Sequence, residues 1–174
     1  MAIAHRKRAV MAERFKFILL VLVLALGSAG PAWGVEVGMA APDFSLNSLD
    51  GQKLSLAEFR GQKPVLLYFW STWCYQCKKE WPKLLEIASG SGHPEIIVIG
   101  INVGVNDSAG KADNYRKKYG LTFPIVFDQK SRLTHSYGVI TVPTNLIIDR
   151  QGIVRYRGAS LPEELETYLE TSEP

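Results

Sequence analysis

The chain has 174 residues, a formal net charge of +3 and only two cysteines. Residues 1–34 hold five Lys/Arg against one acid, a net +4, which leaves −1 for residues 35–174. The basic character therefore lies in the first segment, and the remainder gives no reason to expect binding to nucleic acid. That remainder has the length of one domain with a single core.

The first segment has the pattern of an export signal. Basic residues precede an apolar run from Phe17 to Leu26, and small residues follow it. A run this short favours a secretory signal peptide over a membrane span. Counted from Phe15 to Trp33, however, the stretch is nearly long enough to span a bilayer, so an uncleaved N-terminal anchor stays open. We expect residues 1–34 to be a signal peptide or a membrane anchor. Residues 35–174 then work outside the cytoplasm, in the periplasm or on the outer face of the cytoplasmic membrane, where disulfides persist.

The rest of the chain predicts alternating strands and helices. Asp50-Gly51 marks the turn of a short hairpin, because Asp-Gly is a favoured hairpin turn. Residues 64–70 carry no charge, which indicates a central strand covered on both faces. The further elements expected, in chain order, are a helix over 75–88, a strand over 95–101, a helix that Asp107 or Ser108 can cap and that runs to Tyr119, a strand over 124–127, a helix over 131–137, a hairpin of 144–149 with 153–157, and a helix over 162–169. This order predicts an α/β fold with a mixed sheet.

The two cysteines, Cys74 and Cys77, have C-x-x-C spacing between the strand over 64–70 and the helix over 75–88. Cys74 then lies at the helix N-terminus, where unpaired N–H groups and the helix dipole favour a thiolate. Cys77 lies one turn further, within disulfide reach, so the pair can cycle between dithiol and disulfide. A purely structural disulfide closing so small a loop would contribute only about 2 kcal/mol. No histidine has ligand spacing to the cysteines, so we predict a redox-active disulfide with no metal and no cofactor.

The segment from Phe69 to Pro82 resembles the thioredoxin superfamily, and more narrowly its exported ResA-, TlpA- and CcmG-like thiol–disulfide oxidoreductases. Residues 41–44 resemble the added N-terminal hairpin of that branch, residues 102–120 its central strand-helix insertion, and residues 141–144 its cis-proline loop. The likeness covers residues 38–170. It implies a thioredoxin-like mixed β-sheet flanked by helices, with an N-terminal β-hairpin and a central strand-helix insertion.

The resemblance implies a role for each site residue. Cys74 would be the attacking thiolate, and Cys77 would resolve the mixed disulfide. Trp73 would shield the pair and offer apolar surface to a partner. Pro143 would be cis and would hold the Val142 backbone beside Cys74, where it could pair with an extended substrate.

Glu80 lies three residues after Cys77 and therefore on the same face of the helix. A carboxyl group there could take or return the Cys77 proton. Ordinary thioredoxins use an aspartate two residues before the last tryptophan of the strand, a position held here by Tyr68, whereas the ResA-like branch carries a glutamate matching Glu80. The alternative is a solvated helix glutamate beside Lys78 and Lys79.

The resemblance implies a disulfide reductase that acts on protein substrates, with the haem-attachment cysteines of apocytochrome c as one such substrate in cytochrome c maturation. A membrane thiol carrier of the DsbD or CcdA type would supply the electrons. The family usually has a proline between its cysteines, but this chain has Tyr75 and Gln76, which leaves the direction of electron flow open. We favour a reductant because no added cation within the motif stabilises the thiolate. A disulfide-donating oxidase is the alternative.

Two other functions are less favoured by the sequence. A peroxiredoxin-like thiol peroxidase shares the Pro42-Asp43-Phe44 opening, but its signature requires Thr and Pro where this chain has Ser71 and Leu67. A non-catalytic binding module that keeps the fold is disfavoured by the intact cysteine pair.

Overall fold

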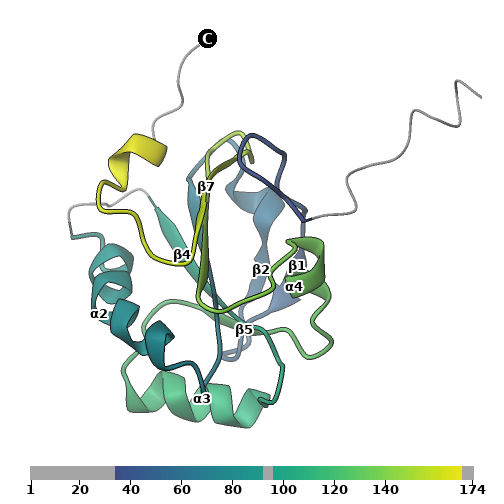
Figure 1. Cartoon of the computed structure of the whole chain (residues 1–174), viewed down its shortest axis with the longest axis vertical. Coiled ribbons are helices and arrows are strands. Elements are labelled where there is room, and N and C mark those ends of the chain that lie inside the picture. The colour runs from purple at the N-terminus through teal and green to yellow at the C-terminus, as the bar shows by residue number, and fades with distance from the viewer. Residues whose placement is uncertain (1–33, 92–95, 170–174) are drawn as a thin grey trace, which may run out of the picture. The chain divides into compact units, whose positions relative to one another are not determined.

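A computed structural model describes residues 34–91 and 96–169, so the predicted signal or anchor lies outside the described residues except for Gly34. The described residues belong to one unit that begins at Gly34 and is built on a five-stranded sheet of order β5-β4-β3-β6-β7 (Figure 1). The strands are β3 (Val65–Trp70), β4 (Ile97–Asn102), β5 (Ile125–Phe127), β6 (Thr144–Ile148) and β7 (Val154–Gly158). Because β3 is parallel to β4 and antiparallel to β6, the sheet is mixed, as predicted.

β3 is the middle strand, and all six of its residues are buried. Its even-numbered side chains pack into one hydrophobic cluster and its odd-numbered side chains into another, as the alternation of a strand requires. Both faces of the strand are therefore covered, which explains its uninterrupted apolar sequence.

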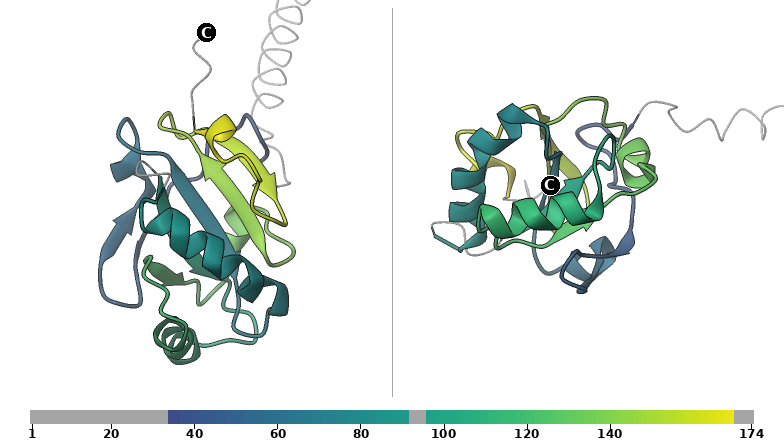
Figure 2. Two further views of the ribbon diagram at one scale, coloured as in Figure 1. Left: turned by 90° about the vertical axis from the view of Figure 1, so that its left-hand side faces the viewer. Right: turned by 90° about the horizontal axis from the view of Figure 1, so that it is seen from below.

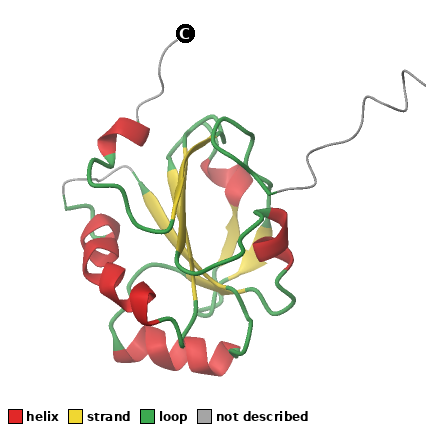
Figure 3. Ribbon diagram, in the orientation of Figure 1, coloured by secondary structure: helices red, strands yellow, loops and turns green. Residues whose placement is uncertain are grey.

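Helices α2 (Tyr75–Ala88) and α3 (Ala109–Lys118) cover one face of the sheet. In the left view of Figure 2, α2 crosses in front of β3. The other face is covered by shorter elements, which lie on the opposite side of the sheet in Figures 1 and 3. These are β1 (Ser45–Asn47), β2 (Lys53–Ser55), the 3-10 helix η1 (Leu56–Phe59) and α4 (Arg132–Ser136).

As far as β7, the predicted order of strands and helices is confirmed, including the N-terminal hairpin of β1 and β2. Within residues 102–120, the predicted insertion contains the helix α3, while its strand content is limited to Asn102, the last residue of β4. No helix in the described part of the chain is long and apolar enough to cross a membrane.

The α-helix predicted over residues 162–169 is wrong. That segment contains only a short 3-10 helix, η2 (Glu166–Tyr168). Lys83 Nζ donates a hydrogen bond to the Pro162 carbonyl at 2.6 Å. The backbone bonds further along run from the Tyr168 N–H to the Leu165 carbonyl and from the Leu169 N–H to the Glu166 carbonyl, which is the i→i−3 pattern of a 3-10 helix. A segment of about eight residues has little helical stability of its own, so its contacts with the rest of the protein decide its conformation.

Candidate active site

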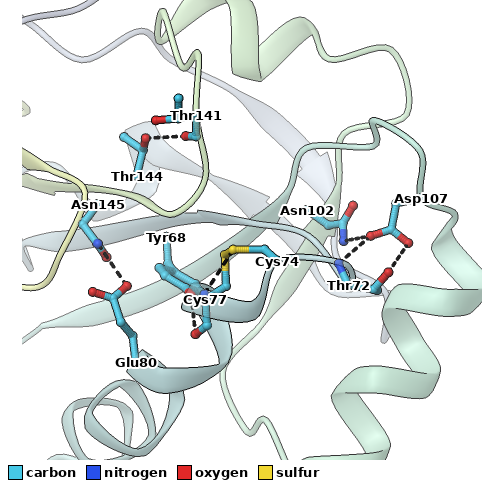
Figure 4. The surroundings of a disulfide bond; sticks show 10 residues. All are labelled: Tyr68, Thr72, Cys74, Cys77, Glu80, Asn102, Asp107, Thr141, Thr144 and Asn145. Carbon is cyan, nitrogen blue, oxygen red and sulfur yellow. Dashed lines mark hydrogen bonds between the residues drawn. A yellow bond between two sulfur atoms is a disulfide. The ribbon is translucent and has the colours of Figure 1, made fainter.

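The Cys74–Cys77 disulfide lies where β3 leads into α2 (Figure 4), with a Cα–Cα distance of 5.3 Å. Cys74 is the N-cap residue of α2, and its Sγ accepts the backbone N–H of Cys77 at 3.1 Å. Cys77 is completely buried, whereas Cys74 is 5% exposed, so a partner's sulfur reaches Cys74 first. In the reduced form, the same N–H group and the helix N-terminus would stabilise a Cys74 thiolate.

Trp73 presents an exposed aromatic ring beside this disulfide. Its side chain is 52% exposed, and its indole Nε1–H donates to the Val105 carbonyl at 2.8 Å. The ring is therefore held against the loop that follows β4, where Val105 is also exposed. This is the position expected of a residue that contacts a partner, and the contact itself stays a prediction.

Asp107 holds the turn before the cysteines, a role that the sequence did not indicate. Its carboxylate accepts the Thr72 N–H at 2.7 Å, the Thr72 hydroxyl at 3.0 Å and the Asn102 side-chain amide at 2.8 Å (Figure 4). Sequence analysis left Asp107 and Ser108 as alternative helix caps. The structure assigns the cap to Ser108, whose Oγ accepts the Lys111 N–H at 3.2 Å.

The Val142–Pro143 peptide bond is cis, as the resemblance implied. The Thr144 hydroxyl fixes this loop by donating to the Thr141 carbonyl at 2.7 Å. No described residue hydrogen-bonds to the Val142 backbone, which leaves it available to another chain. A cavity of about 470 Å³ adjoins the loop, and its lining includes both Val142 and Trp73.

Glu80 points from α2 toward β6 and not into solvent (Figure 4). Its Oε2 accepts the Asn145 side-chain amide at 3.2 Å, and its Oε1 accepts the Leu161 backbone N–H at 2.8 Å. The alternative of a freely solvated glutamate is therefore wrong. Proton exchange between Glu80 and Cys77 stays a prediction.

Tyr68 and Asn145 complete the buried side of the site and face each other across β3 and β6. The Tyr68 hydroxyl donates to the Cys77 carbonyl at 2.7 Å. Burial raises the pKa of Tyr68, and the Glu80 charge raises it further, so the phenol remains a donor. Asn145 is completely buried, and among the described residues its Oδ1 has no hydrogen-bond partner. A lone amide in the apolar run of β6 was the signal that could have identified it.

Comparisons with known proteins agree with this geometry. Residues 37–157 match the AhpC/TSA family. The chain is 33% identical over 173 residues to "Thiol-disulfide oxidoreductase ResA" of Bacillus thuringiensis subsp. konkukian, an alignment that covers 93% of this chain and 98% of that protein.

Two solved structures are also similar. One, from Chlorobium tepidum, is described as a thiol:disulfide interchange protein DsbE and has a TM-score of 0.66 at 27% identity, covering 74% of this chain and 89% of that one. The other is StoA of Bacillus subtilis, with a TM-score of 0.61 at 27% identity, covering 68% of this chain and 87% of that one.

Proposed function

The chain belongs to the AhpC/TSA family of thioredoxin-like proteins and is a thiol–disulfide oxidoreductase of the ResA, DsbE and StoA type, and from this premise we propose that it is a disulfide reductase that acts on proteins outside the cytoplasm. The observation that carries the proposal is the asymmetry of the Cys74–Cys77 pair at the N-terminus of α2. One sulfur can meet a partner there, while the other is enclosed.

The reaction proceeds in two exchange steps. The Cys74 thiolate attacks one sulfur of the substrate disulfide, forms a mixed disulfide and releases the other substrate sulfur as a thiolate, which takes a proton. Cys77 then loses its proton and attacks Cys74 Sγ, which releases the second substrate thiol. The substrate gains two electrons and two protons, and the enzyme is left with the Cys74–Cys77 disulfide. Glu80 is the group we propose to accept the Cys77 proton.

The surface around Cys74 supports binding of an extended protein segment. The unpaired Val142 backbone before the cis proline can form hydrogen bonds with a substrate strand, as in other cases of strand addition. Trp73 lines the same adjoining cavity and provides apolar contact there. These features support a protein as the substrate.

The N-terminal sequence supports export, and the ResA-like resemblance names the reactants to test first. They are the haem-attachment cysteines of apocytochrome c as substrate and a DsbD- or CcdA-type membrane thiol carrier as electron donor. Alkaline phosphatase fused after Pro174 tests the location, because that enzyme needs disulfides and is active only after export. Inactivity of a stably expressed fusion would contradict an extracytoplasmic location.

The direction of electron flow is tested by the reduction potential of the Cys74–Cys77 pair. The full-length chain in non-ionic detergent is equilibrated in thiol redox buffers, and its tryptophan fluorescence is followed. A potential more negative than about −200 mV, the range of glutaredoxins and thioredoxin, is expected. A less negative value, toward the roughly −120 mV of DsbA, would make the protein a disulfide donor.

A further inference from the structure

The helices beside the disulfide carry an unbalanced positive charge. Together, α2 and α3 contain seven Lys/Arg and three acids, although residues 35–174 as a whole have a net charge of −1. Two of the three acids are occupied within the protein. Glu80 is turned inward onto Asn145 and Leu161, and Asp113 pairs with Arg116 at 2.9 Å and Lys117 at 2.6 Å.

Two other acids lie near the site but are not placed to bind a partner's cations beside the cysteines. Asp107 keeps its negative charge near the turn, but its oxygens already accept hydrogen bonds from Thr72, Asn102 and Ser108, so they are not open to a partner. Glu86 is exposed, but it lies twelve residues after Cys74, about 18 Å along the axis of α2. The charged residues that follow the second cysteine directly, Lys78 and Lys79, are both positive.

Aromatic rings hold three of these cations in place. Lys79 Nζ lies 4.9 Å from the ring centre of Tyr75, the 69%-exposed residue between the cysteines. Lys78 Nζ lies 5.1 Å from the Tyr115 ring, and Lys118 Nζ lies 5.3 Å from Tyr119. Such contacts restrict a lysine side chain while leaving its charge near solvent.

We call Lys78, Lys79 and Lys118, with their tyrosines, the cationic rim. Tyr115 and Tyr119 are in ring contact at 5.5 Å, which joins the Lys78 and Lys118 sites. Lys78 lies one helical turn after Cys74 and therefore on the same side of α2. A partner whose sulfur reaches Cys74 must bring its neighbouring residues close to this rim.

We propose that the rim selects protein partners whose reactive cysteines are flanked by acidic residues. The inference extends the proposed function to the kind of partner, and it rests on exchange at Cys74 in either direction. A protein fits better than an anionic lipid surface, because the rim lies beside the sulfur that must contact the partner. Opposite charges there would raise the rate of encounter and hold the mixed disulfide in register.

The test uses two disulfide peptides that differ only in their flanks, four glutamates in one and four lysines in the other. The full-length chain in non-ionic detergent is pre-reduced and freed of reductant. Its oxidation by each peptide is then followed by tryptophan fluorescence in stopped flow. The reverse exchange, between the oxidised chain and each peptide dithiol, is measured as well. Charge selection acts in both directions, so it can be read even if the protein proves to be an oxidase.

We expect the glutamate peptide to react at least tenfold faster than the lysine peptide at low ionic strength. The ratio of the two rates should fall toward one near 1 M salt, where the screening length is about 3 Å. Lys78→Glu and Lys79→Glu should each reduce the ratio. Lys63→Glu is the matched control, because it makes the same charge change at an exposed residue before the start of β3, about 20 Å from the strand's other end.

Equal rates for the two peptides, or a ratio that Lys78→Glu and Lys79→Glu leave unchanged, would overturn the inference. Lys78→Gln and Lys79→Gln provide the same readout without introducing a negative charge. Equal peptide rates together with association to anionic vesicles that Lys79→Glu abolishes would assign the rim to a lipid surface instead.

Discussion

A single carboxylate, that of Asp107, fixes the backbone that leads into the cysteine pair. Replacing it with asparagine exchanges one acceptor oxygen for a donor, so one of the two backbone N–H groups that it accepts, those of Thr72 and Ser108, loses its partner. We expect Asp107→Asn to lower the free energy of unfolding by about 1–3 kcal/mol and to slow exchange at Cys74 about tenfold.

The control for Asp107 is Ser108→Ala, which removes the N-cap of α3. That loss should cost about 1 kcal/mol but leave the exchange rate unchanged. Urea unfolding and stopped-flow exchange measure the two effects. If both variants slowed exchange in proportion to their instability, Asp107 would have no separate role in positioning the turn.

Glu80 is the second residue whose contacts predict a kinetic effect. Glu80→Gln keeps an oxygen that can accept the Leu161 N–H, but its new NH₂ group faces the NH₂ group of Asn145. The two side chains can still form a hydrogen bond if the buried Asn145 side chain turns its unpartnered Oδ1 toward the new NH₂ group. The variant cannot accept a proton, so we expect attack by Cys77 to slow about 10²-fold.

Rapid acid quenching followed by mass spectrometry should then show a longer-lived mixed disulfide at Cys74. Glu86→Gln, an exposed change on the same helix, should leave its lifetime as in the wild type. An unchanged lifetime in Glu80→Gln would remove Glu80 from the proton path.

At the scale of elements, the sequence predicted what depends on neighbouring residues. The apolar run of β3, the Asp50-Gly51 turn and the spacing of Cys74 and Cys77 each act over a few positions, and the structure has the expected elements there. The predicted C-terminal helix was wrong, and the contact that anchors its first residues comes from Lys83, far away in sequence, to the Pro162 carbonyl. The roles of Asp107 and Asn145 were missed for the same reason, since their partners lie on other elements.

The ion pairs of Asp113 with Arg116 and Lys117 in α3 should make a pH-dependent contribution to the stability of the fold. Hydrogen bonds from Lys117 and then Arg116 lower the pKa of Asp113. A carboxyl whose pKa is lower in the folded state stabilises the fold above its ordinary pKa of about 4 and loses this effect as the pH falls below it. Asp113→Asn should therefore lower the Tm at neutral pH but not near pH 2.

Thermal unfolding followed by circular dichroism measures that difference. Lys117→Met should show the same pattern as Asp113→Asn, while Lys63→Met serves as the unrelated cation. A Tm difference for Asp113→Asn of equal size at both pH values would mean that its ion pairs do not stabilise α3.

At the scale of the whole molecule, the redox pair and the fold are linked by one thermodynamic cycle. The potential of Cys74–Cys77 in the folded protein differs from that in the unfolded chain by the amount that reduction changes folding stability, about 1.4 kcal/mol for each 30 mV. DsbA is a strong oxidant because its reduced form is stabilised. For a reductant we expect the opposite, an oxidised form that is more stable than the reduced form. The oxidised chain should therefore unfold at a higher urea concentration than the chain held in dithiothreitol.

Tryptophan fluorescence can report unfolding, because Trp70 and Trp81 pack edge to face at 5.8 Å in the core. Cys77→Ser is the control, since it cannot form the disulfide and its midpoint should not respond to dithiothreitol. A reduced form more stable than the oxidised one would contradict a reductase. Folding would then favour the dithiol form of Cys74 and Cys77, and the protein would tend to transfer its disulfide to a substrate.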